Sequence, residues 1–133
     1  MSARTTIYAL LGTMLTLLAI DALWLTVLMG ATYESYLGSL MLAEPKLVPA
    51  AVFYVLYPIG LLVFAVVPAL RKHDWRTAML LGGLLGLVAY GTYDLSNLAT
   101  LRGWPWQLTI IDMAWGTFLS AVSASAGYLA GKR

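Results

Sequence analysis

The sequence predicts an all-α membrane protein: a bundle of four transmembrane helices with both termini in the cytoplasm. Of its 133 residues, 61% are hydrophobic and only 11% are charged, whereas soluble domains carry about 25% charged residues. Four apolar stretches are also long enough to cross a bilayer, which takes about 20 residues each. These are residues 5–29, 48–70, 77–100 and 107–130. They occupy most of the chain, so we expect one transmembrane domain over residues 1–133.

The distribution of basic residues predicts the orientation of the bundle. With four spans, six of the eight Lys and Arg residues lie on the side of the termini. They are Arg4, Arg71, Lys72, Arg76, Lys132 and Arg133, and the two on the other side are Lys46 and Arg102. Cytoplasmic loops are enriched in such residues. We therefore expect the termini in the cytoplasm and residues 30–47 and 101–106 outside.

Polar side chains interrupt the apolar spans in one layer, beneath the outer ends. At a rise of about 1.5 Å per residue, Asp21, Asp94 and Asp112 lie about 8–12 Å below those ends, on three different spans. Tyr54 and Tyr57 occupy the same half of the second span. Because a carboxyl group in hydrocarbon is costly, such side chains usually turn inward and find partners. We expect these residues to converge in the outer half of the bundle.

Helical spacing supports this convergence. Gly83, Gly86, Tyr90, Asp94 and Asn97 follow steps of three and four and line one face of the third span. The fourth span carries a similar stripe. It consists of Asp112, Gly116, Ser120, Ala124 and Gly127. Small residues at this spacing are typical of contacts between membrane helices. The "GGLLG" stretch at 82–86 fits either a homo-oligomer interface or packing within the chain.

The candidate site combines the acidic, amide and aromatic side chains of this layer. It consists of Asp21, Trp24, Tyr54, Tyr57, Tyr90, Asp94, Asn97, Asp112 and Trp115. Two interpretations stay open. The residues form a functional site, as intramembrane ionisable groups usually do, or they hold the helices together by hydrogen bonds. For the 30–47 segment, an interfacial segment is the favoured interpretation and a lid over the site the other.

Several kinds of chemistry are excluded. The chain has no cysteine and a single histidine, His73 in the "RKHDWR" loop. Thiolate chemistry, iron–sulfur clusters and multi-histidine metal sites within one chain are therefore ruled out. The basic residues lie at helix ends rather than in a patch, so a nucleic-acid partner is not expected. We expect no cofactor and no metal.

Four motifs carry a resemblance to a known family: "LLAIDALWL", "YESYLG", "GLVAYGTYDLSNLATLRGWP" and "LTIIDMAWG". In their order and spacing, along nearly the whole chain, they resemble an uncharacterised bacterial membrane family catalogued as domain of unknown function 2177. The resemblance implies a four-span protein of the bacterial inner membrane. The residues that match the family pattern by this resemblance are Asp21, Trp24, Tyr33, Tyr90, Asp94, Asn97, Asp112 and Trp115. The resemblance implies no activity.

Three functions fit these observations. The first is a pocket open toward the periplasmic side that binds, or modifies, a lipid or small amphiphile; in an enzyme, one carboxyl would act as acid and another as base. The second is a small proton-coupled transporter. The third is a non-enzymatic subunit or assembly factor of a larger membrane complex. Without a nucleophile motif, whether the protein is an enzyme stays open.

Overall fold

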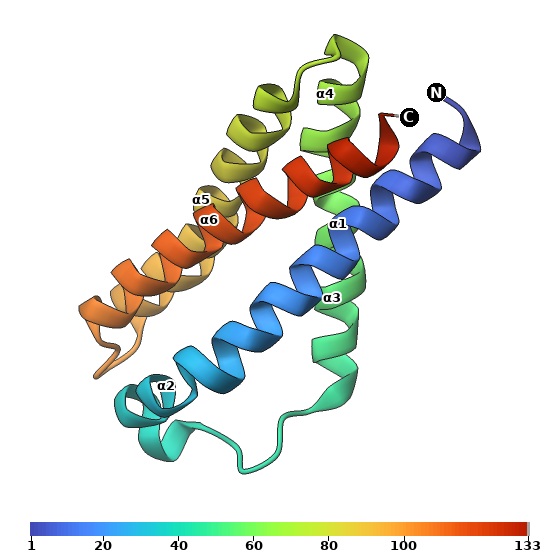
Figure 1. Ribbon diagram of the computed structural model, residues 1–133. Helices are drawn as coiled ribbons and strands as arrows, with labels where there is room; N and C mark the ends of the chain where they lie inside the picture. The colour runs from blue at the N-terminus through green and yellow to red at the C-terminus, as the bar shows by residue number, and fades with distance from the viewer. Residues whose placement is uncertain (133) are drawn as a thin grey trace.

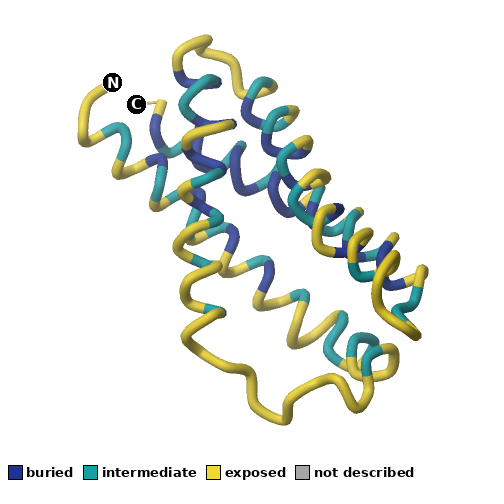
Figure 2. The backbone as a smooth tube through the Cα atoms, turned by 180° about the vertical axis from the view of Figure 1, so that it is seen from behind, coloured by how far each residue is buried: buried dark blue, intermediate teal, exposed yellow. Residues whose placement is uncertain are grey.

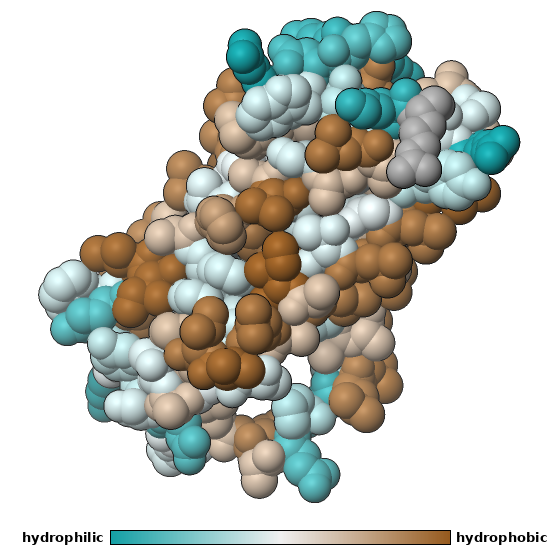
Figure 3. All heavy atoms as spheres, viewed as in Figure 1, coloured by the Kyte–Doolittle hydropathy of each residue, from teal (hydrophilic) through white to brown (hydrophobic). Residues whose placement is uncertain are grey.

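The computed structural model describes residues 1–132 and confirms the all-α fold with four membrane-spanning helices. Each span contains 26 residues, about 39 Å of helix, which exceeds the hydrocarbon core of about 30 Å. The spans are Ala3–Leu28, Leu47–Lys72, Trp75–Thr100 and Trp106–Gly131. In Figure 3 a broad apolar surface lies between hydrophilic ends, as a lipid environment requires.

The first span consists of α1 (Ala3–Leu23) and a π-helical extension, η1 (Trp24–Leu28). The Ser2 side chain caps α1 by accepting a 3.1 Å hydrogen bond from the backbone N–H of Thr5, which satisfies a donor left free at the helix start. π-helical turns are rare and recur at functional sites. In this chain the π-helical turn carries Trp24 to the candidate site described below.

A short helix, α2 (Gly30–Leu37), follows the first span and continues into the 3₁₀ turn η2 (Gly38–Leu40). Gly38 has a φ of 47°, a conformation that glycine adopts at little cost, and it ends α2. Figure 1 places α2 beside the far end of α1, near the turn that joins α5 and α6. Within the segment expected as an interfacial re-entry or a lid, residues 30–40 are thus helical and residues 41–46 contain no helix.

The second span consists of α3 (Leu47–Leu61), the π-helical segment η3 (Leu62–Val66) and α4 (Val67–Lys72). Pro68 at the start of α4 cannot donate a backbone hydrogen bond. The π-helical turn directly before it changes the local bonding pattern, which accommodates the missing donor. Pro58 lies inside α3 and is buried.

The last two spans are α5 (Trp75–Thr100) and α6 (Trp106–Gly131), joined by a turn in which Gly103 has a φ of 79°. The helices α5 and α6 run side by side in Figure 1, and α6 also packs against α1. The N- and C-terminal ends and the α4–α5 turn lie at one end of the bundle (Figure 1). The α2 helix and the α5–α6 turn lie at the other end.

The half of the bundle near the termini is closely packed through small residues. A Cβ atom added at Gly82 would lie 2.7 Å from the Cβ of Ala124, and one at Gly12 would lie 2.7 Å from that of Ala130. At Gly127 it would collide with Thr13. Glycine at these positions lets the helix backbones approach closely. The glycines of the "GGLLG" stretch face α6 of the same chain.

The other half is packed less completely. From residue 22 to residue 57, no residue is fully buried, and Figure 2 shows this stretch as exposed or intermediate. The apolar core, which includes Leu17, Leu61 and Leu119, lies beyond it. The difference leaves room between the spans at the α2 end, and the candidate site lies there.

Candidate functional site

Asp21 lies on α1 and is held by two donors from other spans. The Tyr54 hydroxyl of α3 donates to Asp21 Oδ2, and Trp115 Nε1 of α6 donates to Asp21 Oδ1 at 3.0 Å. The residue is only 6% exposed. Both carboxylate oxygens therefore have partners, and this one group connects three helices.

Asp112 lies on α6, and its hydrogen-bond partner belongs to α2, which is outside the four spans. The Tyr33 hydroxyl of α2 donates to Asp112 Oδ1 at 2.7 Å. Tyr33 in turn accepts a 3.0 Å hydrogen bond from Trp24 Nε1. Burial raises the pKa of Tyr33 above its ordinary value, partly offset by the Trp24 hydrogen bond, and the negative charge of Asp112 raises it further. Tyr33 thus stays a donor at neutral pH.

The two acidic groups are linked through a pair of indoles. The rings of Trp24 and Trp115 stack with centroids 4.0 Å apart and 4° between their planes. Trp115 donates to Asp21, and Trp24 donates to Tyr33, which donates to Asp112. This series of contacts fixes the relative positions of α1, α2 and α6.

Asp94 of α5 differs from the other two carboxyl groups. It is 0% exposed, and neither of its oxygens has a hydrogen-bond partner within residues 1–132. A buried, unpaired carboxylate is costly, so Asp94 requires a proton or a cationic ligand.

Tyrosines of α3 and α5 complete the interior of the site. The hydroxyl of Tyr57 lies 2.5 Å from Ser120 Oγ, and the rings of Tyr57 and Tyr90 meet edge to face at 6.2 Å. The Tyr90 ring occupies the space that a side chain at Gly116 would need. Gly116 is therefore required for the position of Tyr90.

Of the nine residues predicted from the sequence, Asn97 stands apart. It is half-buried, and its side chain makes no hydrogen bond within the part of the chain that the structure describes. The other eight lie within the contacts given above. The three carboxyl groups among them have different surroundings.

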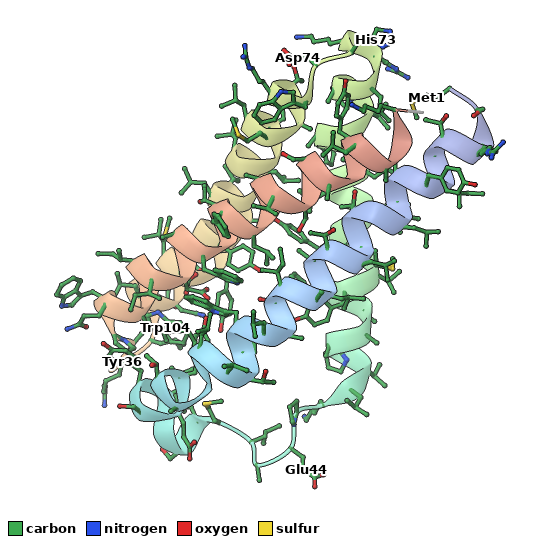
Figure 4. All side chains as sticks on the ribbon, viewed as in Figure 1. Met1, Tyr36, Glu44, His73, Asp74 and Trp104 are labelled. Carbon is green, nitrogen blue, oxygen red and sulfur yellow. The ribbon has the colours of Figure 1, made fainter. Side chains whose placement is uncertain are left out.

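A cavity of about 550 Å³ opens beside Asp94 and Asp112. It is lined by Leu25, Tyr33, Leu37, Met41, Phe53, Ala89, Tyr90, Tyr93, Asp94, Trp104, Leu108 and Asp112. Asp21 is not part of this lining. Trp104 lies at the α5–α6 turn, at the same end of the bundle as Tyr36 of α2 (Figure 4). The cavity therefore lies at the α2 end, between α5, α6, α3 and the η1–α2 segment.

Sequence reasoning missed several residues of this cavity. Tyr33, Phe53, Tyr93 and Trp104 were not in the predicted site, although Tyr33 belonged to the "YESYLG" motif. The structure brings Tyr33 to Asp112 across 79 residues of sequence. Trp104 is fixed by donating a 3.0 Å hydrogen bond to Thr109 Oγ1, and its ring meets Tyr93 edge to face at 5.7 Å. Aromatic residues that neighbour acidic positions in the sequence, such as Tyr93 beside Asp94, could have indicated this part of the lining.

Comparison with known proteins identifies the family. A protein-family model described as "Predicted membrane protein (DUF2177)" matches residues 6–129. The chain belongs to this family. No curated protein and no solved structure matches it. The match to the DUF2177 family includes every residue that lines the cavity, and the family's description agrees with the four membrane-spanning helices.

Proposed function

We propose that this DUF2177 protein binds an amphiphilic molecule in the cavity, with a polar headgroup at Asp94 and Asp112 and an apolar chain along the surrounding walls. The observation that carries the proposal is the buried, unpartnered carboxyl of Asp94 in the wall of a cavity of about 550 Å³. Ligand sites typically measure about 300–1,000 Å³ and combine apolar walls with a few polar groups. This cavity has that composition.

The three carboxyl groups have separate roles in this proposal. Asp21 has both oxygens bonded and does not line the cavity, so its role is to connect helices. Asp112 is oriented by Tyr33 and faces the cavity. Within residues 1–132, Asp94 has no hydrogen-bond partner that would compete with a ligand. In this proposal Asp21 has a structural role, and Asp94 and Asp112 have the functional role.

We also propose that the cavity faces the outer leaflet of a bacterial inner membrane. His73, Asp74 and Met1 mark one end of the bundle, and Glu44 and Trp104 mark the other (Figure 4). Arg4, Lys72 and Arg76 belong to the His73 end, and an excess of such residues is typical of the cytoplasmic side. A molecule of the outer leaflet would then reach the cavity from the membrane.

Binding is favoured over transport through the bundle because of the packing near the termini. Transport by alternating access needs a route from the site to both sides of the membrane. Between the cavity and the termini, an added Cβ at Gly86 would collide with the Gly116 carbonyl, and one at Gly82 would lie 2.8 Å from the Ser120 carbonyl. Such close backbone contacts support a site open at one end.

Mass spectrometry of molecules that copurify with the full-length protein tests the proposal. We expect a lipid or other amphiphile with the wild type and its loss with Asp94→Ala and with Asp112→Ala. The control is Glu34→Gln, which removes an exposed carboxyl one residue from Tyr33. Equal amounts in all four proteins, or no amphiphile in any, would contradict the proposal. A stable protein partner in mild detergent, with no amphiphile, would favour a subunit of a larger complex.

A further inference from the structure

The cavity presents two carboxyl groups without a basic side chain beside them. Asp94 and Asp112 lie in its wall, and the lining contains no lysine, arginine or histidine in the part of the chain described. Lys46 and Arg102, which belong to this end of the bundle, are both exposed. A carboxylate kept from water is stabilised by a cation in contact with it. An anionic headgroup would instead be repelled.

Aromatic rings form much of the remaining wall. Five aromatic residues line the cavity: Tyr33, Phe53, Tyr90, Tyr93 and Trp104. The rings of Tyr93 and Trp104 stand at 87° to each other, so they present differently oriented surfaces. Aromatic faces attract cations, most strongly when water is excluded, and aromatic cages recognise ammonium groups in this way.

We propose that the headgroup bound in this cavity is an alkylammonium, that is, a primary or quaternary ammonium attached to an apolar chain. This inference rests on the proposed function and specifies its ligand class. A divalent metal ion fits the cavity less well, because calcium needs six to eight oxygen ligands. Within residues 1–132 no group of three acidic or histidine side chains is arranged to hold a metal.

Two probes of equal shape test whether the wild-type protein prefers a positively charged headgroup to an uncharged one. Dodecyltrimethylammonium and its uncharged analogue, in which carbon replaces the nitrogen, differ only in charge. Titration calorimetry in a nonionic detergent should show the ammonium binding at least about tenfold more tightly, because a desolvated cation–π contact alone contributes about that much. Equal affinities, or tighter binding of the uncharged probe, would overturn the inference.

Two variants separate this inference from the proposed function. Asp94→Asn should reduce the preference for the ammonium probe over the uncharged probe by about tenfold or more, because it removes a carboxyl from the cavity wall. Ala89→Phe, which places a ring in the cavity, should abolish binding of both probes. If the wild type binds both equally and Ala89→Phe binds neither, the ammonium inference fails and the amphiphile site stands. If the wild type binds neither, both fail.

The source of the ammonium is tested with lipids. The full chain is reconstituted in vesicles of equal phosphatidylethanolamine and phosphatidylglycerol, and retained lipid is measured by native mass spectrometry. Preferential retention of phosphatidylethanolamine supports a membrane lipid as the source. Binding of dodecyltrimethylammonium without retained lipid supports a free alkylamine. Preferential retention of phosphatidylglycerol would overturn the inference, because its headgroup has no ammonium.

Discussion

The Tyr33 hydroxyl donates a 2.7 Å hydrogen bond to Asp112, which ties the short helix α2 to the start of α6 across 79 residues of sequence. The same hydroxyl accepts from Trp24 at the end of the first span. Tyr33, Leu37 and Met41 all line the cavity. The segment after the first span therefore forms part of the cavity wall, and Tyr33 is its polar attachment to the bundle.

Tyr33→Phe should loosen α2 without unfolding the bundle. The substitution keeps the ring and removes both hydrogen bonds, and a hydrogen bond to a charged group contributes about 1.5–3 kcal/mol. Hydrogen exchange over Gly30–Leu37 should therefore become about 10- to 100-fold faster, while exchange in α6 is unchanged. Tyr36→Phe is the control, since Tyr36 is exposed and lies on the same helix. Equal exchange in both variants would show that the Tyr33 contact does not hold α2.

Alkaline pH should weaken the same attachment. Burial raises the pKa of Tyr33 in the folded protein, so the folded state favours the protonated hydroxyl. Below about pH 10 the hydroxyl is protonated in both states and its contribution is present in full. Above about pH 10 the unfolded chain ionises first, so stability falls. Thermal unfolding should show a larger alkaline loss for the wild type than for Tyr33→Phe. Parallel curves would contradict this.

The positions of the four spans were predictable because hydropathy alone determines them. The expected span 107–130 lies inside the observed Trp106–Gly131, and the other three agree to within two residues at each end. The polar layer was predictable for a related reason, since helical spacing and the cost of lipid exposure place Tyr90, Asp94 and Asp112 toward the interior.

A pocket in this layer was among the predictions, but the residues that line it were not predictable, because contacts distant in sequence create it. Helical spacing says which side chains face inward, but it does not say which carboxyl receives donors. Asp21 and Asp94 looked equivalent in sequence, yet one has two partners and the other has none within residues 1–132. Asn97 shared the spacing of Asp94 but lies nearer the end of α5, where it is only half-buried.

Asp21→Asn should destabilise the protein, whereas Asp94→Asn should not. Asn at position 21 keeps one acceptor and loses the charge that strengthens the bonds from Tyr54 and Trp115, so we expect about 1–3 kcal/mol of destabilisation. At position 94 it replaces an unpartnered buried carboxyl, so we expect unchanged or higher stability without ligand. Thermal unfolding in detergent measures both. Destabilisation by both variants to the same extent would favour a structural role for Asp94.

The proposed orientation can be measured because the natural chain has no cysteine. Single cysteines at exposed positions, His73→Cys in the α4–α5 turn and Glu44→Cys before α3, mark the two ends of the bundle. In intact cells a membrane-impermeant maleimide should label Glu44→Cys and leave His73→Cys unlabelled until the cells are lysed. The reverse pattern would place the cavity toward the cytoplasm.

Two glycines three residues apart on α5 test the close packing of α5 against α6. A Cβ at Gly86 would collide with the carbonyl of Gly116 and lie 2.7 Å from the Cβ of Ser120, so Gly86→Ala should destabilise the protein by about 1–3 kcal/mol. At Gly83 the nearest atom would be the Cβ of Ala121 at 3.6 Å, an ordinary contact. Gly83→Ala should therefore be neutral or stabilising by up to about 1 kcal/mol, because alanine favours the helix.

Thermal unfolding in detergent, followed by circular dichroism, measures the stability of both glycine variants under the same conditions. Because helix propensity changes equally at the two positions, the difference between them reports the α5–α6 contact alone. A Gly86→Ala protein as stable as Gly83→Ala would mean that the helices lie farther apart. The half of the bundle near the termini would then have room for a route to the second side of the membrane, as transport requires.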